Sequence, residues 1–152
     1  MSKHIRWLLA MAAVTAIAAC TATSNSPLQV LTTAEHESAN LPFSEAVVAG
    51  DLIFLSGQIG AKPGSLNVVA GGIEAETRQA LTNLQDVLER HGASMDQVAK
   101  CTVFMLDMAQ WSAMNKVYVS FFPNHKPARS ALAASGLAVG ASVEIECIAA
   151  RR

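Results

Sequence analysis

Residues 73–90, IEAETRQALTNLQDVLER, carry the pattern that decides the fold of this chain. Their apolar positions recur with a period of about 3.6 residues, which places them on one face of a helix. These positions are Ile73, Ala80, Leu81, Leu84, Val87 and Leu88. Glu74 and Glu76 fall in the expected first turn, where carboxylates stabilise the helix dipole, and Gly92 follows the expected end. The stretch therefore predicts an amphipathic helix that packs against another layer.

Strand patterns lie on both sides of this helix. The predicted strands cover residues 28–32, 46–49, 52–55, 98–106, 131–134 and 142–149. Gly50 and Asp51 separate the second strand from the third and indicate a tight hairpin. Residues 56–60 end the third strand, and residues 61–67, which contain proline and glycine, are predicted as a loop.

A second helix is predicted to begin near Asp107. Asp107 and Gln110 have the spacing of a capping box, in which the side chain of each residue accepts a hydrogen bond from the backbone N–H group of the other. The helix is expected to bury Trp111, Met114, Tyr118, Phe121 and Phe122. Pro123 ends it, because proline lacks the N–H group that a helix interior requires.

This order of elements predicts an α+β fold. We expect a two-layer sandwich in which a mixed sheet is covered on one face by two helices. The other face of the sheet would carry alternating apolar residues with nothing over them. An uncovered apolar face of this kind indicates an oligomer, and closed rings are the usual solution.

The N-terminal segment has the pattern of a secretory signal. Lys3 and Arg6 precede an uncharged apolar run at residues 7–19, and Ile17-Ala18-Ala19-Cys20 then places small residues before a cysteine. This ending resembles the lipobox of bacterial lipoproteins, in which the cysteine is lipidated and becomes the new first residue. The run is shorter than the roughly 20 apolar residues of a membrane span. An uncleaved anchor and a signal peptide cut elsewhere remain the alternatives.

The predicted organisation therefore has three parts. Residues 1–19 form a signal peptide, with the lipobox cysteine at Cys20; residues 20–27 form a flexible tether rich in Ser and Thr; and residues 28–152 form one domain. We expect a lipoprotein of the cell envelope that faces the periplasm and touches the membrane only through its lipid anchor.

Charge and composition exclude some kinds of function. The chain has 11 Lys and Arg residues against 12 Asp and Glu residues, and loss of residues 1–19 would remove two bases and no acid. There is no basic block, so nucleic-acid binding is disfavoured. The 4 histidines lack the spacing of metal ligands, so no metal site is predicted.

Cys101 and Cys147 both fall in predicted strands. The favoured interpretation is two buried thiols that act as small apolar side chains. An exported protein could instead oxidise the pair to a disulfide, but neither the spacing nor the context of the two residues indicates a pair.

Two charged motifs near the C-terminus indicate a site. Arg129 stands in Lys126-Pro127-Ala128-Arg129-Ser130, directly before an apolar strand, and its guanidinium offers a planar fork of donors matched to a carboxylate. Glu144 and Glu146 alternate with apolar residues and would share one face of the last strand. If the two strands end near one site, the pair would combine an anion anchor with an acid/base group. That combination indicates chemistry on a small carboxylate-bearing substrate.

The chain from about residue 40 to residue 152 resembles the RidA/YjgF family of reactive-intermediate imine deaminases, which has a chorismate-mutase-like fold. The matching runs are PFSEAV (42–47), SGQI (56–59), TRQALTNL (77–84), HGAS (91–94), TVF (102–104), NKVY (115–118), FF (121–122), PARS (127–130) and VEIE (143–146). The resemblance implies a homotrimer with clefts between its subunits.

The resemblance also implies roles for individual residues. Arg129 would bind the substrate carboxylate, and Glu144 would handle the attacking water together with the main-chain carbonyl of Ala131. Main-chain groups at Ser56 and Gly57 would close the pocket.

Three further positions belong to the predicted substrate site. Phe43 stands where the family's deaminases usually have tyrosine, so it keeps the ring and loses the hydroxyl. Tyr118 and Asn115 are expected to line the site, although Asn115 is equally well interpreted as a hydrogen-bonded core residue.

The implied activity is hydrolytic deamination of reactive 2-imino or enamine acids to 2-keto acids and ammonia, without a metal or cofactor. The main alternative is a protein that binds small carboxylates such as 2-keto acids in the trimer cleft without turnover, which the loss of the hydroxyl at Phe43 and the predicted export favour. Ribonuclease activity is a third alternative, which the acidic balance of the chain disfavours.

Overall fold

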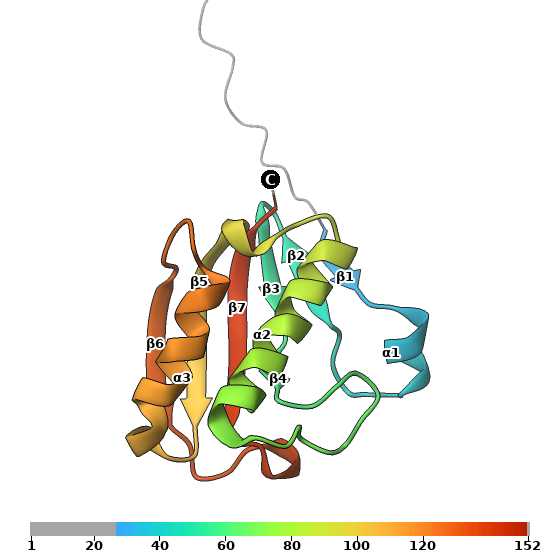
Figure 1. The fold of residues 1–152 in the computed structure, drawn as a ribbon. Coiled ribbons are helices and arrows are strands. Elements are labelled where there is room, and N and C mark those ends of the chain that lie inside the picture. Colours follow the sequence, from blue (N-terminus) through green and yellow to red (C-terminus); the bar gives the residue numbers. More distant parts are fainter. Residues whose placement is uncertain (1–26, 152) are drawn as a thin grey trace, which may run out of the picture.

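The computed structural model describes residues 27–151, which form one mixed sheet with helices α2 and α3 on the same face (Figure 1). The strands are β1 Gln29–Leu31, β2 Ala46–Ala49, β3 Leu52–Leu55, β4 Gln58–Ile59, β5 Val98–Met105, β6 Ala128–Ala133 and β7 Val143–Ala150. The helices are α1 Ala34–Ser38, α2 Gly72–Arg90 and α3 Trp111–Tyr118, with short 3-10 turns at Met95–Gln97, Met108–Gln110, Val119–Phe121 and Ala138–Gly140. The expected α+β fold, which combines a mixed sheet with helices, is thus observed.

The strand order is β1-β2-β3-β7-β5-β6, and β4 pairs with β7 beyond the end of β3. β5 and β6 run parallel, whereas the other neighbouring pairs are antiparallel, so the sheet is mixed as predicted. The parallel pair exists because the chain crosses over the sheet through α3 between β5 and β6.

Helix α2 packs on the centre of the sheet and supplies much of the core. All six apolar positions that define its predicted face are buried. Three polar residues of the helix, Glu76, Thr77 and Asn83, are buried with them. The Asn83 amide donates to the carbonyl oxygens of Ile59 and Ala61 at 3.3 and 2.8 Å, which ties the segment after β4 to the helix. The expectation that Glu76 lies in the first turn is wrong, because α2 begins at Gly72 and only Glu74 of the two carboxylates falls in that turn.

The second helix starts later than its sequence pattern predicts. The Asp107 side chain caps a 3-10 turn by accepting the backbone N–H of Ala109 at 2.8 Å, and α3 begins only at Trp111. The Trp111 side chain is 42% exposed rather than buried, because it lies in the first turn at the open edge of the layer. Two short elements, α1 and β4, had no clear pattern in the sequence and were not predicted.

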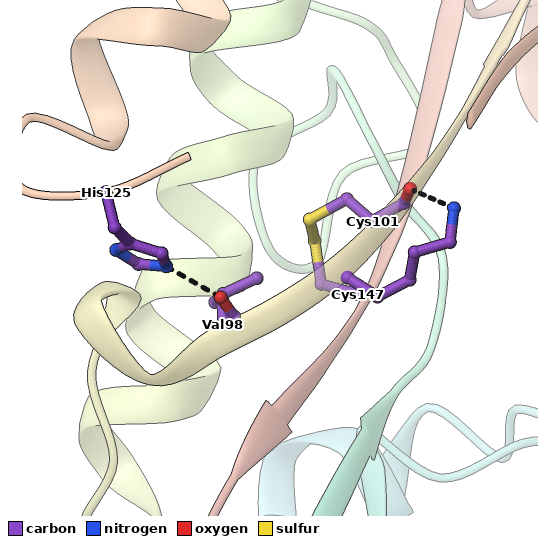
Figure 2. Close-up of a disulfide and its surroundings, with 5 residues drawn as sticks. Val98, Cys101, His125 and Cys147 are labelled. Atoms are coloured by element: carbon purple, nitrogen blue, oxygen red, sulfur yellow. Dashed lines mark hydrogen bonds between the residues drawn. A yellow bond between two sulfur atoms is a disulfide. The ribbon is translucent and has the colours of Figure 1, made fainter. Parts of the chain in front are cut away.

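Cys101 and Cys147 form a disulfide between β5 and β7, so the interpretation as free thiols is wrong for this structure (Figure 2). The two residues are direct partners in the antiparallel ladder, with Cα atoms 4.1 Å apart. Both are buried beneath the helices. Their separation of 46 residues gave no sign of pairing, because only the register of β5 against β7 brings them together.

Figure 2 also shows how the segment before β6 is fixed to β5. The His125 ring lies 2.7 Å from the Val98 carbonyl oxygen, so its Nε2 donates to the first residue of β5. This contact helps to set where β6, and with it Arg129, begins.

The sheet face opposite α2 and α3 is uncovered among the described residues and carries several exposed apolar side chains. Leu52 and Phe54 of β3 and Leu132 of β6 are each at least 40% exposed there, beside the half-buried Ile148 of β7. No helix within residues 27–151 is long and apolar enough to cross a membrane. The predicted signal peptide, the lipidation of Cys20 and nearly all of the tether lie outside the described residues and stay predictions.

Candidate functional site

Arg129 lies on the helix-covered face of β6, where the side chains of α3 surround its guanidinium. Nη1 donates to the Asn115 side-chain oxygen at 2.6 Å. The Cζ atom lies 4.6 Å from the centroid of the Tyr118 ring and 5.7 Å from that of Trp111, both within the range of cation–π attraction. One amide and two aromatic rings therefore fix the position of the guanidinium.

Trp111, Asn115 and Tyr118 are spaced at i, i+4 and i+7, so they form one stripe along α3. Sequence reasoning placed Asn115 and Tyr118 at the site and assigned Trp111 to the core. A polar asparagine between two aromatic residues on that stripe was the available signal that the stripe faces a charged group.

The Tyr118 hydroxyl is buried and has no hydrogen-bond partner within the described part of the chain. Burial raises the pKa of Tyr118 to about 12, and the positive charge of Arg129 opposes part of that rise. Tyr118 is therefore neutral at physiological pH, and it supports Arg129 through its ring and not through a negative charge.

Glu144 lies on the opposite, uncovered face of the sheet. It is a partner of Ile59 in β4 and of Phe104 in β5. Its carboxylate lies directly over the backbone of Gly57, because a Cβ atom at Gly57 would fall 2.1 Å from Glu144 Oε1. Only glycine fits at this position while the carboxylate stays where it is.

The surroundings of Glu144 favour its protonated form. Partial burial raises the pKa of the Glu144 carboxyl above its ordinary value, and the nearby negative charge of Glu146 raises it further. Glu146 shares the face of Glu144, as the alternation predicted, and is exposed. A raised pKa brings the carboxyl group closer to the pH at which it can both accept and return a proton, as a general acid/base requires.

Ser56 joins this region to the loop that carries Phe43. The Ser56 hydroxyl donates to the Ser44 carbonyl at 2.6 Å, and its backbone N–H donates to the Glu45 carbonyl at 3.0 Å. The Phe43 ring is 51% exposed and meets the His36 ring edge to face at 5.6 Å. Ser56 and Gly57 thus lie next to Glu144, and Ser56 connects them to the loop that carries Phe43.

The predicted site residues consequently fall into two groups. We call Asn115, Tyr118, Arg129 and Ala131 the arginine half-site, and Phe43, Ser56, Gly57 and Glu144 the glutamate half-site. β5 lies between β6 and β7, and the register pairs Cys101 with both Arg129 and Cys147, so these three residues share the helix-covered face. Side chains along β7 alternate between the two faces, and Glu144 falls on the face opposite to that of Cys147. It shares this uncovered face with its partner Phe104.

The two motifs therefore do not meet at one site within a single chain. The physical reason is that successive side chains of a strand point to opposite faces of the sheet, so a shift of one residue moves a side chain to the other face. Ala131 follows Arg129 on the helix-covered face, as a partner of Val103.

Two surface hollows of about 460 and 570 Å³ lie elsewhere on the described part of the chain. The first is lined by residues of α2 such as Arg78, by Asp96 and by Asn124 in the segment after α3, and the second by residues around β1. Neither contains a residue of the two half-sites. Within residues 27–151 no group of three or more His, Cys, Asp or Glu side chains could hold a metal ion. The absence of a metal and of a cofactor from the reaction stays a prediction.

Comparison with known proteins identifies the family. The family model described as Endoribonuclease L-PSP matches residues 33–151. A protein of Capra hircus named 2-iminobutanoate/2-iminopropanoate deaminase is 40% identical over 121 residues, which cover 80% of this chain and 88% of that protein. The human protein of the same name is 36% identical over 121 residues, with the same coverage of 80% and 88%.

Solved structures agree with this assignment. The YjgF gene product of E. coli matches with a TM-score of 0.68 and 35% identity, covering 73% of this chain and 89% of that one. E. coli TdcF, solved with bound serine, matches with a TM-score of 0.68 and 31% identity, covering 74% of this chain and 90% of that one. The chain belongs to the RidA/YjgF family, and its curated relatives include proteins named as imine deaminases.

Proposed function

We propose that the protein hydrolyses small 2-imino acids, of the 2-iminobutanoate and 2-iminopropanoate type, to 2-keto acids and ammonia. The observation that carries the proposal is the pair of half-sites: an arginine fixed for carboxylate binding, and a partly buried glutamate with a raised carboxyl pKa over a glycine backbone. The names of the relatives and the serine bound to TdcF support a small amino-acid-like substrate.

In the proposed reaction, Arg129 holds the substrate carboxylate through parallel N–H donors. A water held by Glu144 and the Ala131 carbonyl of a neighbouring chain forms a bond to the imine carbon while Glu144 takes its proton. Glu144 passes this proton to the nitrogen, which gives a carbon that carries a hydroxyl and an amino group. Glu144 then takes the hydroxyl proton and passes it to the amino group, and ammonia leaves as the C–N bond breaks and the carbonyl forms. The reaction consumes one water and leaves Glu144 in its starting state.

The proposal requires a homotrimer, because the half-sites of one chain face away from each other across the sheet. The exposed Leu132 lies in one row with Phe104 and Glu144, and the exposed Phe54 pairs with Ile148 further along β7. These apolar side chains make the uncovered face suited to a second copy of the chain. The arginine half-site of one chain would then meet the glutamate half-site of its neighbour, three times around a closed ring.

A Glu144→Gln variant tests the catalytic part of the proposal. The wild type should accelerate ammonia release from freshly generated 2-iminopropanoate, whereas the variant should lose about 10²- to 10⁴-fold in kcat, as expected for a lost acid/base group. Pyruvate binding should change little, because Arg129 is untouched. Turnover of the wild type should fall as the pH is lowered through a value above the usual range for glutamate, because the base must be ionised. Steady-state kinetics across pH and calorimetric titration with pyruvate measure these effects.

The same assays decide between the proposed function and its alternatives. The exposed Phe43, which lacks a hydroxyl, favours a protein that binds keto acids without turnover. Keto-acid binding would replace the proposed deamination if the folded wild type binds pyruvate through Arg129 and does not accelerate ammonia release from 2-iminopropanoate. RNA cleavage by the wild type that disappears in Arg129→Ala would instead support the ribonuclease alternative.

Mixing two inactive variants tests the assembly. Arg129→Ala damages only the arginine half-site, and Glu144→Gln damages only the glutamate half-site. Mixed trimers should contain one intact site, so random mixing of equal amounts should restore about a quarter of wild-type activity. Light scattering should give about three times the chain mass for the wild type and both variants. Failure of the mixture to regain activity, or a stable monomer, would remove the site between subunits.

A further inference from the structure

Glu76 is a buried carboxylate that the proposed reaction does not use. Glu76 is only 4% exposed, and within residues 27–151 its carboxylate has no ion pair with Lys, Arg or His. Both of its oxygens accept hydrogen bonds from Ser142: Oε2 from the backbone N–H at 2.6 Å and Oε1 from the hydroxyl at 2.7 Å. Burial of a carboxylate is costly unless its oxygens are bonded in this way, so the contact with Ser142 is specific.

Ser142 is the residue at which the chain enters β7. Glu144 follows it by two positions, and the Ser142 carbonyl accepts the backbone N–H of Leu106 at 3.1 Å, just past the end of β5. The bonds from Glu76 and Leu106 therefore hold the start of the strand from two sides. A shift at Ser142 would move the Glu144 carboxylate.

Glu76 also contacts the other strand beside Glu144. A Cβ atom at Gly60 would lie 2.5 Å from both Cα and Cβ of Glu76, so the helix rests directly on the Gly60 backbone. Gly60 follows β4, in which Ile59 is the partner of Glu144. The Glu76 carboxylate thus fixes the entry of β7, while the helix at Glu76 packs on the exit of β4, and these two strands pair at Glu144.

We infer that Glu76 is a positioning residue for Glu144: by holding Ser142, its carboxylate keeps the Glu144 carboxylate over Gly57, where the water must be held. The effect on turnover rests on the proposed function, whereas the placement of Glu144 does not. Glu76 acts at the glutamate half-site only, since neither of its contacts involves β6 or α3.

The test compares three substitutions on α2. Glu76→Ala should lower kcat about 10- to 100-fold, the scale of a misplacement by roughly 1 Å, while KM and pyruvate binding change less than about twofold. Glu76→Gln should restore kcat to within about threefold of wild type, because its amide oxygen accepts from the Ser142 N–H and its amide N–H donates to the Ser142 hydroxyl. Glu74→Ala, which removes only an exposed ion pair with Lys116, should behave as wild type.

An independent readout is the titration of Glu144 by carbon-13 NMR of its carboxyl. In Glu76→Ala the pKa of Glu144 should fall toward its ordinary value as the carboxylate leaves its partly buried position, and in Glu76→Gln it should stay raised. If Glu76→Ala does not fold, Ser142→Ala, which removes one of the two bonds, should show the same shift to a smaller extent.

Each negative outcome has a separate meaning. An unchanged titration of Glu144 in a folded Glu76→Ala or Ser142→Ala protein would overturn the positioning role. Equal losses of turnover and pyruvate binding would assign Glu76 to general stability instead. A wild type without deaminase activity would remove the proposed function, and the NMR titration would still decide whether Glu76 positions Glu144.

Discussion

Arg129→Lys should be nearly as inactive as Arg129→Ala, although it keeps the positive charge. The guanidinium is held by the Asn115 oxygen and by the faces of Tyr118 and Trp111, all of which suit a flat, delocalised cation. A lysine ammonium cannot offer two parallel N–H donors to a carboxylate. Losing a charge-assisted bidentate contact removes about 2–4 kcal/mol, or on the order of 30- to 1000-fold in kcat/KM.

Steady-state kinetics with 2-iminopropanoate and calorimetric titration with pyruvate measure this effect. The matched control is Arg78→Lys, the same exchange at an exposed position of α2 outside both half-sites, which should leave both quantities unchanged. A fully active Arg129→Lys protein would show that only the charge at this position matters, and the planar fork would then have no role in binding.

Removing the disulfide should lower the stability of the domain by about 2–4 kcal/mol, because the bond closes a long loop and so restricts the unfolded chain. The suitable variant is Cys101→Ala with Cys147→Ala, since both positions are buried and serine would introduce hydroxyl groups without partners. For a domain of this size the midpoint of thermal unfolding should fall by roughly 6–16 °C.

Thermal unfolding with and without reductant, at one protein concentration, is the measurement. Reductant should lower the midpoint of the wild type and leave that of the double variant unchanged. If the wild type is insensitive to reductant and a thiol assay finds both cysteines free, the interpretation as two buried thiols is restored.

The parts of the fold that the sequence predicted well depend on local periodicity. Helix α2 repeats its apolar positions over five turns, so its face and its end could be predicted from the sequence alone. Helix α3 is shorter, and an aromatic residue in it can be interpreted either as a core residue or as one that packs beside a cation. Trp111 was misplaced for that reason.

The arrangement of the site depends on pairing between distant segments. Whether Arg129 and Glu144 share a face is decided by the registers of β6 and β7 against β5, and a difference of one residue reverses the answer. The same registers bring Cys101 opposite Cys147. Glu76 was misinterpreted for a related reason: its partner Ser142 is 66 residues away, and nothing near Glu76 indicates that contact.

Because the two half-sites lie on opposite faces of one chain, the proposed activity depends on the concentration at which chains assemble. A solitary chain would be inert, so the rate per molecule would depend on how many copies share a given volume. If Cys20 carries a lipid as predicted, chains held on one membrane would meet in a thin layer at high effective concentration. Attachment to a surface would then favour the active assembly even where few copies are made.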